Sequence, residues 1–357
     1  MSKRLKICIV SSGLKMGGIE RATSNLANGL AAEGQEVTFT AVYNMKKFFT
    51  LDKSVRFIEP ADFNRGTFSL FKTIFWLRKI IFVEKPDVII VYNIFYAAVV
   101  SAALLFSKHK IYLSERSSPF YVWSPQVRIF DRLIFWLKKP KGIIAQTRIA
   151  AEVQQKYYGK DVPIKVIPNA VKSIRLFPEI KREKTILAVG RFGDTCKGFD
   201  RLIPAFALLK NQDWRLVFAG GDEDGDYLKK QAEDLGILHR IDFLGRVKAM
   251  DEVYARAGIF VIPSRSEGFP NALCEAMAAG LPCVSFDFTA GPADLIEPNI
   301  NGILVQDGDI PALAEAVDYL ILHPEIRNEL GSNALKVRER LSMQNINRQV
   351  LDFIQQQ

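Results

Sequence analysis

Cysteine and histidine are scarce in this chain of 357 residues. The four cysteines, Cys8, Cys196, Cys274 and Cys283, include no Cys-x-x-Cys pair, and the three histidines form no cluster with cysteines or carboxylates at metal-ligand spacing. A disulfide framework and a zinc site are therefore not expected, which agrees with a reducing cytosol. Cys8, Cys274 and Cys283 stand in apolar runs and are expected to be small buried side chains.

Long apolar runs are also absent. No stretch of about 18 uninterrupted apolar residues occurs, so no transmembrane helix is expected. The first apolar run, Ile7 to Val10, is too short for the core of a signal peptide. We therefore expect a cytoplasmic protein, whose membrane contact, where it has one, is made at its surface.

Length and composition fit two globular domains, because 48% of the residues are hydrophobic and 24% are charged. The net charge of +9 is unevenly placed. Residues 1–170 hold 26 Lys and Arg against 12 Asp and Glu, whereas residues 171–357 hold 22 against 27. A basic half predicts an anionic partner, and charge alone leaves nucleic acid, an anionic membrane and a phosphorylated substrate open.

Apolar segments alternate with helical patterns in both halves. An apolar strand (5–10), a loop (11–18), a helix from about Ile19 to Ala32 and a second strand (37–42) form the opening unit of a parallel α/β sheet. The other expected strands are 88–91, 111–113 and 143–145, then 185–189, 215–219, 241–244, 259–262, 283–286 and 303–305. The order predicts two doubly wound Rossmann-like domains, 1–168 and 169–342, with a terminal helix at 343–357.

The segment from Ser264 to Gly280 is the strongest local feature. A strand ends before it, and a helix is expected to begin near Pro270, at the first helical position, which proline tolerates. The backbone amides of Gly268, Phe269, Asn271 and Ala272 would then form an anion site with the helix dipole. Glu267 and Glu275 would flank it as acceptors for sugar hydroxyls, the layout that a nucleotide sugar requires. An ordinary capped helix with two solvated glutamates fits the spacing equally well.

Two further loops carry glycine beside charge. Arg191 and Lys197 share the loop after one expected strand and could balance a leaving diphosphate, although two solvated surface charges fit equally. Gly17 and Gly18 follow the first strand and would let backbone approach a ligand, or form a plain turn. The pattern is not Gly-x-Gly-x-x-Gly, which disfavours a dehydrogenase. Asp222-Glu-Asp224, the nearest sequence to a divalent-metal motif, is expected to form a solvated turn.

Two basic, aromatic stretches lie in the first half, at residues 68–82 and 127–141. Each interleaves Trp, Phe, Leu and Ile with lysine and arginine. Helices of this composition can lie on an anionic membrane surface. Helices that face the core and extend their cations to water are the alternative.

Taken together, these motifs resemble glycosyltransferase family 4, a group of retaining enzymes with the GT-B fold, and in particular its members that build bacterial surface polysaccharides and lipid-linked oligosaccharides. The resemblance covers nearly the whole chain. It rests on Glu267 to Glu275, which matches the family's Glu-x7-Glu motif, on Gly190-Arg191 with Lys197-Gly198, and on Gly17 to Arg21. Gly291-Pro-Ala-Asp294, followed by Asn301-Gly302, is also similar to the family's pattern.

The resemblance implies a role for each matching position. Glu267 would contact the transferred sugar, and Arg191 and Lys197 would bind the diphosphate as it leaves; these three are the expected catalytic residues. The expected donor-binding residues are Gly17, Gly18, Arg246, Val247, Gly268, Phe269, Asn271, Ala272 and Glu275, the last holding the ribose. The two domains would face each other across a cleft, the terminal helix would pack back on the first domain, and no metal would take part. Where many relatives carry a histidine this chain has Arg116, which we expect, with Glu115, to orient the acceptor.

The resemblance implies transfer of a hexose or N-acetylhexosamine, with retention, from a nucleotide sugar, UDP being favoured over GDP. The basic half favours an acceptor at the membrane, such as a polyprenyl-diphosphate-linked saccharide on the inner face of the plasma membrane. A non-hydrolysing epimerase of the same fold and a non-catalytic sugar-nucleotide-binding membrane scaffold are the alternatives. Nucleic acid is not an expected partner, because no nucleic-acid-binding motif is recognisable.

Overall fold

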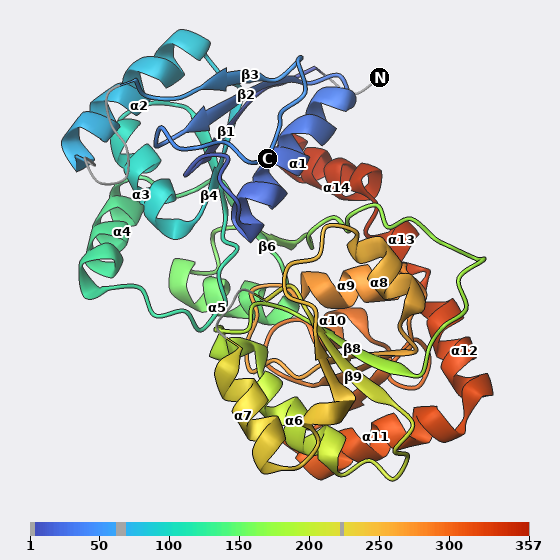
Figure 1. Cartoon of the computed structure of the whole chain (residues 1–357). Coiled ribbons are helices and arrows are strands. Elements are labelled where there is room, and N and C mark those ends of the chain that lie inside the picture. Colours follow the sequence, from blue (N-terminus) through green and yellow to red (C-terminus); the bar gives the residue numbers. More distant parts are fainter. Residues whose placement is uncertain (1–3, 62–68, 222–224, 357) are drawn as a thin grey trace. The chain divides into compact units, whose positions relative to one another are not determined.

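A computed structural model describes residues 4–61, 69–221 and 225–356. The chain divides into two compact units (Figure 1): the first comprises Met1–Ala170 and Met343–Gln357, and the second comprises Val171–Ser342. The boundary between them lies two residues beyond the one expected from the sequence. Among the described residues, no helix combines the length and the apolar character needed to cross a bilayer.

The first unit is built on a seven-stranded parallel sheet in the order β3-β2-β1-β4-β5-β6-β7. Its central strand β4 is buried at every position, which is why it reads in sequence as a continuous apolar run. The strands are β1 (Lys6–Ser11), β2 (Glu36–Ala41), β3 (Arg56–Ile58), β4 (Val88–Tyr92), β5 (Lys110–Ser114), β6 (Gly142–Ala145) and β7 (Ile164–Val166). The helices are α1 (Gly18–Ala32), α2 (Leu70–Glu84), α3 (Ile94–Ala103), α4 (Pro125–Leu137), α5 (Arg148–Tyr158) and α14 (Met343–Gln355).

The last helix, α14, belongs to the first unit and packs beside α1 (Figure 1). A Cβ on Gly29 of α1 would lie 2.0 Å from the Asn347 amide nitrogen, so the glycine allows this close approach. The Tyr112 hydroxyl of β5 donates to the Ile354 carbonyl at 3.3 Å, and its ring meets the Phe353 ring edge-on at 5.6 Å. The C-terminal segment thus completes the core of a domain whose other part ends at Ala170, more than 170 residues earlier.

The second unit holds a six-stranded parallel sheet in the order β10-β9-β8-β11-β12-β13. Its strands are β8 (Thr185–Val189), β9 (Arg215–Ala219), β10 (Ile241–Phe243), β11 (Ile259–Ile262), β12 (Cys283–Phe286) and β13 (Ile303–Val305). The α-helices are α6 (Phe199–Ala207), α7 (Asp226–Asp234), α8 (Met250–Arg256), α9 (Asn271–Ala278), α10 (Pro292–Leu295), α11 (Ile310–Leu322), α12 (Pro324–Ala334) and α13 (Val337–Arg340), with 3-10 turns η2 (Thr195–Lys197) and η3 (Leu238–Arg240).

Both sheets have a point where the strand order reverses. In the first unit it lies between β1 and β4, and in the second between β8 and β11. The loops after these strand pairs run to opposite faces of the sheet and leave a crevice at its carboxyl edge, where ligands of open α/β sheets bind. Two doubly wound Rossmann-like units, as predicted from the sequence, are confirmed.

Two details differ from the sequence-based predictions. The strands β3 and β7, three residues each, were not predicted. Pro270 is the N-cap of α9 rather than its first helical residue. Cys8, Cys274 and Cys283 are buried as expected. The acidic sequence Asp222–Asp224 lies outside the described residues, as does Phe68 at the start of the first aromatic stretch.

Candidate functional site

Lys197 and Glu267 meet at the reversal point of the second sheet. Lys197 ends the turn η2 after β8, and Glu267 lies in the loop between β11 and α9. The Lys197 ammonium lies 2.8 and 3.0 Å from the two Glu267 carboxylate oxygens, and the Ser264 hydroxyl donates to the same carboxylate at 2.9 Å. Both side chains of the ion pair are largely buried. The structure therefore brings together two of the three expected catalytic residues, 70 positions apart, in the ligand crevice.

Two glycines allow the β8 loop to reach this position. Gly198 has φ +66°, and a Cβ there would stand 2.0 Å from the Pro263 carbonyl oxygen at the end of β11. A Cβ on Gly190 would stand 3.0 Å from the Lys197 side chain, which lies across this glycine. Any larger residue at either position would push the lysine away from Glu267.

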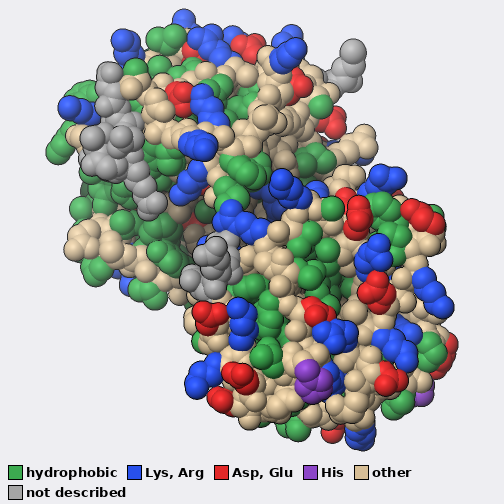
Figure 2. Space-filling model, viewed as in Figure 1, with side chains coloured by type: hydrophobic (Ala, Val, Ile, Leu, Met, Phe, Trp, Pro, Cys, Tyr) green, Lys and Arg blue, Asp and Glu red, His purple; other side chains and the backbone are tan. Residues whose placement is uncertain are grey.

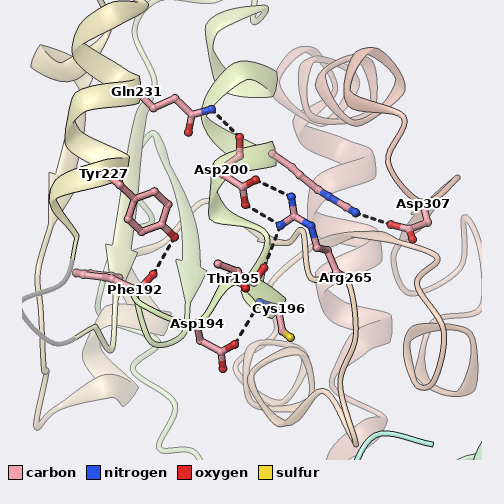
Figure 3. A network of polar contacts seen from close by, with 10 residues as sticks. Phe192, Asp194, Thr195, Cys196, Asp200, Tyr227, Gln231, Arg265 and Asp307 are labelled. Atoms are coloured by element: carbon pink, nitrogen blue, oxygen red, sulfur yellow. Dashed lines mark hydrogen bonds and ion pairs between the residues drawn. The ribbon is translucent and has the colours of Figure 1, made fainter. Parts of the chain in front are cut away.

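A second network ties the same two loops together (Figure 3). The Arg265 guanidinium binds both carboxylate oxygens of Asp200 at 2.7 and 2.6 Å and donates to the Thr195 carbonyl at 2.9 Å. The Arg265 amide donates to the Cys196 carbonyl at 2.8 Å. Hydrogen bonding from Arg265 lowers the pKa of Asp200, and the carboxylate raises the pKa of Arg265 in return. Paired charges of this fork geometry hold both loops in one arrangement.

Sequence reasoning did not find Arg265 and Asp200. They are 65 residues apart, and each by itself reads as a surface charge. The only sequence signal is that each stands next to an expected site segment, Lys197-Gly198 or Ser264 to Glu267. Their contribution is positional, because Arg265 contacts the turn that carries Lys197.

Arg191, the third expected catalytic residue, is exposed. Its guanidinium pairs with Asp194 three residues on, at 2.7 Å, and 73% of its side chain is accessible. Asp194 also caps the turn η2 by accepting from the Cys196 amide. Arg191 therefore lies on the same loop as Lys197 but points to solvent, where a diphosphate could replace Asp194 as its partner.

The start of α9 supplies backbone donors beside Glu267. Asn271 was expected to offer a free amide, and this is wrong: its N–H donates to the Phe269 carbonyl at 2.9 Å. Gly291, with φ +139°, lies against Pro270, where a Cβ would be 2.4 Å from the proline ring. This close contact accounts for the glycine of the Gly291–Asp294 pattern. Phe269 is buried, whereas Gly268 and Ala272 are partly accessible.

Glu275 lies one turn inside α9. The hydroxyl of Tyr254, a fully buried residue of α8, donates to a Glu275 carboxylate oxygen at 3.1 Å. The carboxylate is thereby oriented but stays partly accessible. Arg246 and Val247, expected to face the nucleobase, follow the tight turn at Gly245 (φ +60°), whose carbonyl accepts from the Gly220 amide at 2.7 Å.

The glycine loop of the first unit is partly filled by its own chain. Gly17 is the N-cap of α1, and a Cβ there would be 2.2 Å from a Glu20 carboxylate oxygen. Glu20 is buried and accepts from the Ser12 hydroxyl at 2.7 Å. The start of α1 thus already carries an anion. A Cβ on Gly18 would meet nothing within 4 Å, so a ligand can approach the backbone there.

Glu115 and Arg116 follow β5 in the first unit and are held by internal contacts. The Glu115 carboxylate accepts from the amides of Ile94, Arg116 and Ser117 at 2.8 to 2.9 Å. The Arg116 guanidinium donates to the Ser114 hydroxyl at 2.8 Å and to the Asn169 side chain at 2.7 Å. These bonds fix the loop after β5; the acceptor role expected for the pair stays a prediction.

The two aromatic stretches form α2 and α4, which pack on either side of α3. Both helices turn large apolar side chains to solvent. Figure 2 shows hydrophobic side chains, in green, on the left of the first unit, the side on which α2 and α4 lie in Figure 1. The exposed residues are Phe71, Phe75, Phe82 and Val83 on α2, Phe106 after α3, and Ile129, Leu133, Trp136 and Leu137 on α4; we call these nine the apolar face. Exposed cations stand among them at Lys72, Arg78, Lys79, Arg128 and Arg132.

Both helices do pack one face on the core, as the alternative expected. Leu77 and Ile81 of α2 lie in that core, and partly buried residues of both helices pack against it: Leu70, Ile74, Trp76, Phe130 and Phe135. The exposed apolar residues lie on the remaining faces. Phe106 is fully exposed and has a left-handed backbone, φ +61°, which is unusual for a bulky residue. Exposed apolar side chains gathered on one domain are typical of interaction surfaces.

No group of three or more metal-binding side chains occurs within residues 4–61, 69–221 and 225–356. Positive charge at the crevice of the second unit comes from Lys197 and Arg191.

Two family models match the chain. The model described as Glycosyltransferase Family 4 matches residues 16–174, and the model described as Glycosyl transferases group 1 matches residues 172–337. One relative, the GalNAc-alpha-(1->4)-GalNAc-alpha-(1->3)-diNAcBac-PP-undecaprenol alpha-1,4-N-acetyl-D-galactosaminyltransferase of Campylobacter jejuni, is 28% identical over 342 residues, 92% of each chain. The lipopolysaccharide 1,6-galactosyltransferase of Escherichia coli is 31% identical over 184 residues, 48% of this chain and 51% of that one.

Solved structures share the fold at low sequence identity. The apo form of the lipopolysaccharide outer core galactosyltransferase WaaB has a TM-score of 0.79 at 19% identity, covering 98% of this chain and 100% of that one. Anabaena Alr3699/HepE in complex with UDP-glucose has a TM-score of 0.76 at 18% identity, covering 99% and 100%. The family matches meet at the boundary between the two units, and both domains of the fold are present. The chain therefore belongs to the GT-B glycosyltransferases, with a family 4 domain followed by a group 1 domain.

Proposed function

We propose that this glycosyltransferase transfers a hexose or N-acetylhexosamine from a UDP-sugar, with retention and without a metal ion, to a polyprenyl-diphosphate-linked glycan in bacterial polysaccharide assembly. The observation that carries the donor site is the Lys197–Glu267 pair at the reversal point of the second sheet, beside the start of α9. This crevice offers a cation, a carboxylate and a helix N-terminus within one loop cluster.

Each part suits one part of a nucleotide sugar. Lys197 would bind the diphosphate, and the α9 N-terminus would add up to about 2 kcal/mol of anion stabilisation. Glu267, released from Lys197, would accept hydrogen bonds from the sugar, and Glu275, oriented by Tyr254, would accept them from the ribose. The solved complex of Alr3699/HepE with UDP-glucose, a protein of the same fold, supports UDP as the nucleotide.

The reaction asks for little beyond placement and charge. As the bond between the anomeric carbon and the diphosphate breaks, negative charge grows on the diphosphate, and Lys197 and Arg191 would stabilise it. The leaving oxygen would take the proton of the acceptor hydroxyl, which attacks from the same face and so retains the configuration. Lys197 and Arg191 would supply the positive charge that a divalent metal ion supplies in metal-dependent enzymes.

The acceptor assignment rests on the first unit. Residues 1–170 carry a net charge of +14, and exposed lysine and arginine side chains lie among the residues of the apolar face. Such a surface suits an anionic bilayer, where each nearby cation adds about 1 kcal/mol. The Campylobacter jejuni relative is named for transfer to a saccharide on PP-undecaprenol, a membrane lipid. We place the protein at the inner face of the plasma membrane as a peripheral protein.

The donor site is tested by thermal unfolding with UDP-, GDP- and ADP-sugars in the absence of metal. A ligand at 100 times its dissociation constant adds about 2.7 kcal/mol of stability. We expect a rise in Tm with one UDP-sugar, its loss in Lys197→Met, and its retention in Lys230→Met, an exposed lysine of α7. Transfer activity should fall about 10²- to 10³-fold in Lys197→Met. No shift with any nucleotide sugar would overturn the proposal, and UDP release without an acceptor would favour the epimerase.

The membrane surface is tested by sedimentation with vesicles. Leu133 on α4 is 61% exposed, and Leu208 in the second unit is 56% exposed. Removing an inserted leucine costs about 1.5–3 kcal/mol. Leu133→Ser should therefore weaken binding to anionic vesicles at least tenfold, whereas Leu208→Ser leaves it unchanged. Equal loss in both variants would contradict the assignment of the apolar face.

A further inference from the structure

A cavity of about 270 Å³ lies wholly within the first unit. Its walls come from the loop between β5 and α4, from α5 and from the ends of α3 and β5. Aromatic and aliphatic side chains dominate the lining, among them Phe120, Tyr121, Trp123, Ala150, Val153 and Tyr157. A single water needs only about 10–15 Å³, so this space accommodates a substantial part of a ligand.

The walls offer little to a hydrated group. Of the polar lining residues, Glu115 already accepts from three backbone amides, and the Tyr158 hydroxyl donates to Asp131. The Gln154 amide oxygen and the Tyr157 hydroxyl are buried and have no hydrogen-bond partner among the described residues. Each sugar hydroxyl that stays unpaired here costs about 1–3 kcal/mol. An apolar chain loses no hydrogen bonds on entering the cavity, and the burial of its surface is favourable.

The cavity is lined in part by exposed residues that precede α4, and by Arg128 of α4 itself. Phe120, Tyr121 and Val122 line the cavity and are also 58%, 57% and 81% exposed. The chain continues from them directly into α4, whose exposed Ile129 and Leu133 belong to the apolar face. Apolar side chains are therefore present both at the surface and in the lining of the cavity. Arg128 of α4 is exposed and lines the cavity, which places a cation beside it.

We propose that this cavity binds the isoprenoid chain next to the diphosphate of the lipid-linked acceptor, with Arg128 at the mouth contacting the diphosphate. The inference rests on the proposed function and assigns to the first unit the recognition of the lipid part of the acceptor. A chain drawn from the bilayer along the apolar face enters between Tyr121 and α4, and its anionic group stays at the rim. The acceptor is thereby recognised through its lipid as well as through its sugar.

The test uses farnesyl diphosphate as the probe and inorganic diphosphate as its reference, with the full chain and calorimetric titration. We expect farnesyl diphosphate to bind at least 100-fold more tightly than inorganic diphosphate, because several buried methylene groups each contribute about fourfold. Val153→Phe fills the cavity from α5 and should weaken farnesyl diphosphate binding at least tenfold. Leu322→Phe adds an aromatic ring at an exposed position of α11 in the second unit and should leave binding unaltered.

Two further variants keep the result decisive. Tyr121→Ser alters only the exposed rim, so it should fold and still weaken the probe severalfold. Gln154→Leu removes an unpaired polar atom from the wall and should leave binding equal or tighter. Tighter binding of methyl hexosides than of farnesyl diphosphate, with loss in Gln154→Leu, would instead make the cavity a sugar subsite and overturn the proposal.

Failure here is distinguishable from failure of the donor site. Donor binding is read by the UDP-sugar shift in Tm, which depends on Lys197 in the second unit. If that shift is intact in all cavity variants while farnesyl diphosphate does not bind, the lipid assignment is wrong and the transferase assignment stands. If the UDP-sugar shift is absent in the unmodified protein, the proposed function itself is wrong.

Discussion

Substitution of Gly198 by alanine is the sharpest single test of how the donor site is assembled. Gly198 has φ +66°, and a Cβ would lie 2.0 Å from the Pro263 carbonyl oxygen and 3.5 Å from the Ser264 Cα. Both of those contacts are with backbone, so no flexible side chain can move aside. Lys197 directly precedes Gly198, and Glu267 lies three residues after Ser264. Any shift that relieves the clash therefore separates Lys197 from Glu267.

The expected loss of folding stability in Gly198→Ala has two contributions. A left-handed backbone costs an alanine roughly 1–2 kcal/mol. The clash adds about 1–3 kcal/mol, the usual cost of forcing extra atoms into a packed region. Gly236 is a matched control, because it has φ +69° and a Cβ there would meet nothing within 4 Å. Gly236→Ala should therefore show the first contribution alone.

The assay is thermal unfolding with and without the UDP-sugar that stabilises the unmodified protein. In a domain of this size each kcal/mol corresponds to about 2–4 °C in Tm. Gly198→Ala should lower Tm further than Gly236→Ala and should lose the ligand-induced rise, which Gly236→Ala keeps. The reasoning is refuted if the two variants unfold alike, or if Gly198→Ala binds the UDP-sugar normally.

Two predictions concern pH. Hydrogen bonds from Arg265 lower the pKa of Asp200, so this carboxylate stabilises the fold above its ordinary pKa of 3.8, and the contribution is lost as pH falls through the lowered value. Asp200→Asn should thus lower Tm at pH 7 by the equivalent of about 1 kcal/mol, and the effect should shrink as pH falls below 3.8, as thermal melts across pH would show. Burial raises the pKa of Asp131 to about 6, so the native state disfavours its charge and stability falls as pH rises through that value. Asp131→Asn should raise Tm at pH 8 by the equivalent of at most about 3 kcal/mol and have little effect at pH 4; a uniform gain at both pH values would contradict this.

Local pattern predicted the strands well where the sequence holds a short apolar run. Strands β8, β9, β11, β12 and β13 have the bounds expected from their apolar runs. The edge strands β3 and β7 were missed because a charged residue leaves each with only two apolar positions, whereas the equally short edge strand β13 is apolar throughout. The two aromatic stretches were predicted as helices, but periodicity could not tell which of their apolar residues would find a core. Only packing against α3 decided that Phe75 and Trp136 face solvent.

The residues of the proposed donor site were singled out in the sequence by their glycines and their spacing. The spacing could not show which of these side chains pair with each other. That Lys197 pairs with Glu267, and that Arg265 binds Asp200, follows from β8 and β11 lying side by side at the reversal of the strand order. The expectation that Asn271 offers a free amide failed for a similarly local reason, since the turn at Phe269 takes that amide for itself.

The sequence by itself determined the class of this protein: two parallel α/β domains, their boundary and a set of charged and glycine-rich loops after strands. These features depend on residues close together in the sequence, because a buried strand needs a run of apolar residues and a tight turn needs glycine. Only the tertiary structure decided which loops meet, which helical faces stay bare and where a cavity remains beneath Tyr121 and Trp123. Those outcomes depend on contacts between residues far apart in the chain, which no local pattern contains.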